Sequence, residues 1–189
     1  MTVAVGRFVG LTRDFGPTYA RFKVGLGLFS CVAAVAVSAC GGRSPSAPSL
    51  PDFQGQFAGS YVITSCTEIG VFFSGFCVGS GWNAGSTFPL ELSLVQNQTV
   101  VTGTITLSRG GGSPLRGAFQ GLIQSSGHLT ATAALPPLQL LGTISRDITA
   151  WDTAIAGNGL NGGFTLVHSS STQTGTMTVS ASLLQVTRQ

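Results

Sequence analysis

The chain has few charged side chains: Asp, Glu, Lys and Arg together make up 8% of its 189 residues. After Cys40 it has no lysine, and five arginines are balanced by five carboxylates. The formal net charge of +3 therefore belongs to the segment before Cys40, where four basic residues accompany the single acid Asp14. Proteins that bind nucleic acid show a dense basic patch, and residues 41–189 show none in the sequence. We therefore expect no nucleic-acid partner.

The residues that most enzymes use for acid–base or nucleophilic chemistry are also scarce. The two histidines, His128 and His168, stand apart beside a turn and a strand end, so we expect both to face solvent. The sequence has no Gly-x-Ser-x-Gly elbow before a helix, and neither histidine has the spacing of a zinc site. The Gly110–Gly112 run lacks the Lys-Ser/Thr of a phosphate loop. The sequence predicts a protein that is not an enzyme and has no metal or cofactor.

The chain has no apolar run long enough for a membrane-spanning helix. The uncharged stretch from Val24 to Ala39 is interrupted by glycine and serine, and it is shorter than the ~20 residues that a span needs. The basic residues before it, the apolar stretch itself and the small residues at its end are the parts of an export signal. We therefore assign residues 1–39 to a signal peptide.

The end of this stretch, Val37-Ser38-Ala39-Cys40, resembles the lipobox of bacterial lipoproteins. The resemblance implies cleavage before Cys40 and a diacylglycerol on its thiol, so the membrane becomes a partner through that lipid. Gly41 replaces the aspartate that holds some lipoproteins in the inner membrane. The resemblance thus implies a cell-envelope lipoprotein of the outer membrane, on its periplasmic or surface face. The alternative is that Cys40 is an ordinary small residue after a signal-anchor helix.

The residues after Cys40 divide into a linker and one domain. Residues 41–56 are rich in Gly, Ser and Pro, a composition typical of flexible linkers. We assign residues 40–56 to the lipidated cysteine and its tether, and residues 57–189 to a single folded domain.

Two cysteines, Cys66 and Cys77, remain in the domain once Cys31 leaves with the signal peptide and Cys40 is modified. An even number of cysteines in an exported domain favours a disulfide. Closing so short a loop stabilises a fold by about 3 kcal/mol in the chain-entropy model. The alternative is a metal or redox pair, which the absence of a Cys-x-x-Cys spacing and of a nearby histidine disfavours.

Apolar and polar residues alternate through most of the domain, as in Leu90, Leu92 and Leu94 with the intervening Glu91 and Ser93. This period of two predicts strands with one buried face, and no stretch after Cys40 has a helical period. We predict eight strands: 57–65, 88–96, 99–108, 115–124, 127–135, 140–150, 151–168, with an alternative break near Gly159, and 174–187. Short polar turns between them favour antiparallel hairpins.

A glycine recurs two residues before a large apolar residue in five of these strands, at Gly103, Gly117, Gly142, Gly162 and Gly175. Glycine lets a strand bend sharply or approach its neighbour closely, and repeated bends let a sheet close. The predicted fold is all-β, a single antiparallel up-and-down β-barrel or a strongly curled sheet. In outline it resembles the calycin type of small barrel, which includes lipocalins and avidins; this resemblance is architectural and carries no ligand residue.

The segment between the two cysteines and just beyond is unusually apolar for a loop. It contains Val71, Phe72, Phe73, Phe76 and Trp82, separated by glycines. We consider three interpretations: a plug that completes the core, the lid of an apolar ligand pocket, and a contact surface for a partner protein or membrane. These five residues form our candidate ligand or partner loop.

Together these features predict a non-enzymatic, lipid-anchored envelope protein whose barrel binds a small apolar ligand or an envelope partner. The alternative is a structural or protein-interaction module with a filled barrel core and no ligand. The size of the side chains at inward-facing positions distinguishes the two hypotheses, because large side chains fill a barrel and small ones leave room for a ligand. The sequence has both kinds of residue and leaves the choice open.

Overall fold

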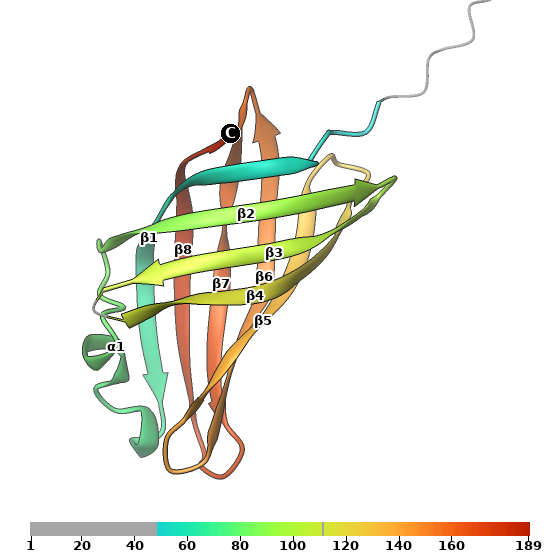
Figure 1. Cartoon of the computed structure of the whole chain (residues 1–189). Coiled ribbons are helices and arrows are strands. Elements are labelled where there is room, and N and C mark those ends of the chain that lie inside the picture. Colours follow the sequence, from blue (N-terminus) through green and yellow to red (C-terminus); the bar gives the residue numbers. More distant parts are fainter. Residues whose placement is uncertain (1–48, 111) are drawn as a thin grey trace, which may run out of the picture. The chain divides into compact units, whose positions relative to one another are not determined.

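The structure, a computed structural model, describes residues 49–110 and 112–189. The predicted signal peptide, Cys40 and most of the predicted tether lie outside these residues. Figure 1 shows the eight strands: β1 (Gly55–Ile69), β2 (Thr87–Asn97), β3 (Val100–Arg109), β4 (Gly112–Ile123), β5 (Leu129–Gln139), β6 (Thr143–Ala156), β7 (Gly159–Ser170) and β8 (Thr176–Arg188).

The eight strands close into one antiparallel barrel, which confirms the predicted fold class. Each strand pairs with the next one in the chain, and β8 pairs with β1 to complete the circle. The first half of β1 pairs with β2, whereas β8 pairs along β1 as far as Ile69. In Figure 1, β2 to β4 run across the direction of β6 to β8, so the sheet curls strongly as it closes. Closure removes the unpaired edges that a flat sheet would expose.

Several predicted strand boundaries differ from the observed ones by a few residues, and the largest difference lies between β6 and β7. The sequence suggested a strand end at residue 150, but β6 continues to Ala156 and β7 begins at Gly159, at the predicted alternative break. The register of β6 against β7 shifts between Ile148 and Ala150, and this bulge leaves both Ile148 and Trp151 buried. An extra residue interrupts the period of two, so the bulge resembles a strand end in the sequence.

The sequence shows no helical period after Cys40, yet two short helical turns are present in the described residues. A 3-10 turn, η1 (Val71–Phe73), and one turn of α-helix, α1 (Phe76–Gly79), lie between β1 and β2. Elements this short do not complete two helical turns, so they leave no helical period in the sequence.

The interior of the barrel is filled by large apolar side chains. Along β2, Leu90, Leu92 and Leu94 are buried while Glu91 faces solvent. The largest fully buried side chains are Trp82, Trp151, Tyr61, Phe53, Phe57, Phe73 and Phe119. Burial of each large apolar side chain contributes about 1.5–3 kcal/mol relative to exposure, so this core is the main source of stability.

Three of the five recurring glycines, Gly103, Gly117 and Gly162, lie in strands that approach a neighbour closely, as the sequence predicts, whereas Gly142 and Gly175 lie in the turns just before β6 and β8. A β-carbon at Gly103 would collide with the carbonyl oxygen of Ser93 on β2. One at Gly162 would collide with the Asp152 carbonyl oxygen on β6, and Gly162 has φ +140°, which favours glycine. These positions allow the sheet to bend and close.

The two ends of the barrel differ. At one end, which we call the tether end, β1 begins and β8 finishes, together with three hairpin turns. There the Phe53 side chain is fully buried and its backbone N–H donates to Gln96 Oε1 at 2.7 Å. Arg188 also binds Asp52 at 2.9 Å. The last residues assigned to the tether from sequence are therefore fixed against the barrel.

The opposite end, which we call the loop end, carries the longest connection. Residues 70–86, which we call the covering loop, join β1 to β2 there, beside the hairpins β3–β4, β5–β6 and β7–β8. In Figure 1 this loop, with α1, lies beside the lower part of β1. The loop end is therefore the region where the candidate residues gather.

Candidate functional site

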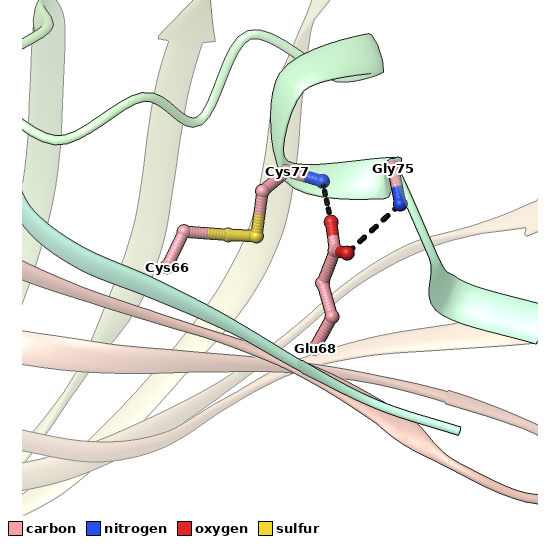
Figure 2. The surroundings of a disulfide bond; sticks show 4 residues. All are labelled: Cys66, Glu68, Gly75 and Cys77. Atoms are coloured by element: carbon pink, nitrogen blue, oxygen red, sulfur yellow. Dashed lines mark hydrogen bonds between the residues drawn. A yellow bond between two sulfur atoms is a disulfide. The ribbon is translucent and has the colours of Figure 1, made fainter. Parts of the chain in front are cut away.

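The covering loop is held at its base by the disulfide that the sequence predicts. Cys66 on β1 and Cys77 on α1 are bonded, with their Cα atoms 5.9 Å apart (Figure 2). The rival interpretation of a metal or redox pair is not needed to explain these cysteines. The bond ties α1 directly to the barrel wall.

Glu68 on β1 provides a second attachment for the loop. Figure 2 shows its carboxylate accepting two backbone hydrogen bonds, from Gly75 N–H at 2.8 Å and from Cys77 N–H at 2.5 Å. Hydrogen bonds to a charged acceptor are stronger than neutral ones. The disulfide and Glu68 together fix the segment that carries the aromatic residues.

The five candidate residues of this loop do not share one environment. Phe73 and Trp82 are fully buried, and Phe72 and Phe76 pack against the core from partly buried positions. The three phenylalanine rings contact each other with centroids 5.0–5.6 Å apart. Val71, in contrast, is 93% exposed. Among the three interpretations, this arrangement favours a plug that completes the core. Val71 does not belong to that plug, because its side chain faces solvent.

Trp82 brings the loop into contact with the barrel interior. Its ring centroid lies 6.4 Å from that of Tyr61, 6.2 Å from that of Phe88 and 6.4 Å from that of His168. Aromatic pairs at such distances and tilts contribute beyond their buried area. Trp82 therefore packs the covering loop against side chains of β1, β2 and β7.

His168, which packs against Trp82, is the first of three neighbouring basic residues, and its position corrects a prediction. We expected it to face solvent, yet only 4% of it is exposed. It follows the buried Leu166 at the strand period of two, and so it points to the same inward face. His128 lies at the tether end with 48% of its side chain exposed, and pairs with Asp152 at 2.7 Å.

Arg146 and Arg109 complete what we call the basic cluster with His168. Arg146 stands between the buried Ile144 and Ile148 on β6 and is itself only 6% exposed. It is the register partner of His168 on the neighbouring strand. Arg109 is half-buried at the end of β3, two residues after the buried Leu107. The period of two was the signal that could have found all three residues.

Burial and mutual repulsion shape the charge of the basic cluster. Burial, followed by the charges of Arg146 and Arg109, lowers the pKa of His168 to about 4. Burial, followed by Arg109, lowers the pKa of Arg146. Burial also raises the pKa of Tyr61, which the Arg109 charge only partly opposes. His168 is therefore neutral at pH 7, whereas both guanidinium groups remain charged.

Some polar side-chain atoms of this region have a hydrogen-bond partner and others have none. Arg146 Nε donates to the Pro136 carbonyl oxygen at 2.7 Å, and the Tyr61 hydroxyl donates to the Ser108 carbonyl oxygen at 2.5 Å. Within residues 49–110 and 112–189, three buried nitrogens lack a hydrogen-bond partner: Trp82 Nε1, Arg109 Nε and His168 Nδ1. Such unpaired groups are rare in native proteins, and here they lie in one region.

None of the five carboxylates in the described part of the chain neutralises the two arginines. Asp52 pairs with Arg188, and Asp152 pairs with His128. Glu68 binds the covering loop. Glu91 is exposed, and Asp147 lies between the buried Arg146 and Ile148, on the alternate face of β6.

The outer surface of the loop end is unusually apolar. The four most exposed large apolar side chains of the described residues are Val71 at 93%, Leu141 at 82%, Val78 at 73% and Ile69 at 65%. All four belong to the covering loop, the end of β1 or the β5–β6 turn. Between α1 and the end of β5, a groove of about 400 Å³ is lined by Phe76, Leu138 and Leu140 among others.

Two further observations concern the predicted environment. No helix in the part of the chain that the structure describes is long and apolar enough to cross a membrane. In the same residues no three potential metal ligands come together.

Comparison of the chain with protein families, with curated proteins and with solved structures found no match.

Proposed function

We propose that this chain is a non-enzymatic, lipid-anchored protein of the cell envelope, whose barrel presents its loop end to an envelope protein partner. The observation that carries the proposal is the gathering of the most exposed apolar side chains at the loop end. Exposed apolar patches on soluble domains commonly mark interaction sites. The lipobox resemblance at Cys40 supports the anchor.

The filled interior supports a partner protein over a small apolar ligand carried inside the barrel. Trp151, Phe119, Phe57 and Tyr61 all point inward, and each is at least 98% buried. A carrier of the usual kind has an apolar pocket of several hundred Å³, which such packing does not favour. The filled interior therefore supports a binding surface outside the barrel, which we propose to comprise Val71 and the neighbouring apolar residues.

The anchor is tested by Cys40→Ala, with Cys31→Ala as the matched control. Cells that express each full-length variant are fed radiolabelled palmitate, and their membranes are then separated from soluble protein. We expect Cys40→Ala to lose both the label and the membrane association, because the thiol that receives the lipid is gone. Cys31→Ala should keep both. Equal labelling of the two variants would contradict the lipid anchor.

The partner surface is tested by photocrosslinking in intact cells. A photoreactive amino acid is placed at Val71 or Leu141 on the loop end, and at Val95, which is 62% exposed at the tether end, as the control. We expect the same protein adduct from both loop-end positions and none from Val95. Val71→Asp should weaken the adduct formed from position 141. Equal adducts at all three positions, or none, would contradict this surface.

A further inference from the structure

We propose that the basic cluster, Arg109, Arg146 and His168, binds a small oxyanion beneath the covering loop. The ligand class is phosphate, sulfate or a short carboxylate. This site lies inside the loop end, whereas the proposed partner surface lies outside it, and it does not depend on the lipid anchor. The inference rests on charge and on hydrogen-bond donors, and the buried neighbours limit the size of the ligand.

The charge argument starts from the two guanidinium groups. Arginine stays protonated in proteins, and Arg146 is only 6% exposed. A buried charge without a counter-charge is strongly unfavourable. Every carboxylate of residues 49–110 and 112–189 lies on another surface or is bound elsewhere. A bound anion would supply the missing negative charge.

The donor argument concerns the unpaired nitrogens. Arg109 Nε and Trp82 Nε1 are always N–H donors, and both are buried without a partner. His168 Nδ1, also unpaired, becomes a donor in the tautomer that carries its proton there. Arg146 is oriented by its Nε bond to the Pro136 carbonyl oxygen, and its two amino groups remain for an acceptor. A planar guanidinium matches an oxyanion that accepts two parallel hydrogen bonds.

The buried neighbours of His168 limit the size of the anion. The Trp82 ring centroid lies 6.4 Å from that of His168, and Met177, the register partner of His168 on β8, is fully buried. Among such closely packed neighbours a small anion is favoured over one that carries a long acyl chain.

The two tryptophans provide a direct readout, because the chain has only Trp82 and Trp151. The full-length chain, labelled with ¹⁵N in detergent micelles, is titrated with inorganic phosphate while sodium chloride keeps the ionic strength constant. We expect the indole N–H signal of Trp82 to move in a saturable way. The Trp151 indole already donates to Thr153 Oγ1 at 2.9 Å, so its signal should stay fixed. Replacement of each tryptophan by Phe assigns the two signals.

Charge-removing variants make the test specific. Arg109→Gln and Arg146→Gln should each weaken phosphate binding by about tenfold, whereas Arg116→Gln on the exposed face of β4 should not. If Arg146→Gln does not fold, the half-buried Arg109 still provides the test. A parallel titration with acetate tells a carboxylate ligand from phosphate. The site is refuted if neither anion moves the Trp82 signal, if both indoles move alike, or if Arg109→Gln binds as the wild type does.

Discussion

At the scale of single residues, Val71 and Phe73 stand two positions apart in the covering loop but have opposite environments. Val71 is 93% exposed and Phe73 is fully buried. We expect Phe73→Ala to lower the free energy of unfolding by about 3–5 kcal/mol, because it leaves a cavity in the core. Val71→Ala should change it by no more than about 0.5 kcal/mol. Urea unfolding of the full-length variants measures both values, and equal effects would mean that the loop does not complete the core.

His168 should make the protein sensitive to acid. Its pKa is about 4 in the folded state, below the ordinary value of 6.5, so protonation favours the unfolded state. The stability that neutral His168 provides is complete above pH 6.5 and is lost as the pH falls toward 4. The loss amounts to about 3 kcal/mol. The charged groups that face it are Arg146 and Arg109, and arginine stays protonated in proteins.

The measurement is the free energy of unfolding at pH 7.5 and at pH 4.5. In His168→Gln the difference between the two values should shrink by most of this amount, since glutamine does not titrate. His128→Gln should behave like the wild type, because His128 lies in an exposed pair at the other end of the barrel. An unchanged pH dependence in His168→Gln would contradict the assignment.

The alternation of residues in the sequence could have predicted that His168 and Arg146 face inward, but their residue types alone favoured exposed positions. Histidine and arginine are usually exposed, and that expectation led to a solvent-facing His168. The alternation Ile144, Arg146, Ile148 indicates an inward arginine once the strand is accepted. The meeting of Arg146 and Arg109 could not be predicted, because it depends on the register across several strands.

At the scale of elements, the disulfide should act mainly on the attachment of the covering loop. We expect the double variant Cys66→Ser, Cys77→Ser to lower the free energy of unfolding by about 3 kcal/mol, the value for closing a short loop in the chain-entropy model. A reducing agent should bring the wild type down to the same stability and leave the double variant unchanged. A reducing agent without effect on the wild type would contradict this contribution.

Most strands could be predicted because their alternation of apolar and polar residues is regular. The exceptions have physical reasons. The bulge near Thr149 adds one residue to β6 and so breaks the alternation that defines a strand. η1 and α1 are single turns, held by Glu68 and the disulfide and not by their own helix propensity.

At the scale of the whole molecule, the two ends of the barrel differ in structure, and the proposed function gives each a separate role. The chain enters at the tether end, where Phe53 is buried and Asp52 binds Arg188. A lipid on Cys40 would connect to this end through residues 41–52, which reach at most about 40 Å when extended. The apolar surface of the loop end lies at the opposite end of the barrel, which in the proposed function faces the envelope partner.

Barrel closure could be predicted from the spaced glycines, but the filling of the interior could not. The inward positions include small residues that suggest empty space when they are read singly. In the structure each faces a large neighbour: Ala131 pairs with Trp151, Ala133 with Ile148, and Ala181 with Phe164. Which small residue faces which large one depends on register, which the sequence does not give.

The most direct test of this account is native mass spectrometry of the full-length protein, released from detergent micelles before and after organic extraction. A barrel filled by its own side chains should carry no apolar ligand in either spectrum; a small anion on the basic cluster, or a covalent lipid that extraction does not remove, would leave this result unchanged. A reproducible additional mass of a lipid or another apolar molecule that extraction removes would contradict the account, because it would mean that the barrel carries an apolar ligand after all.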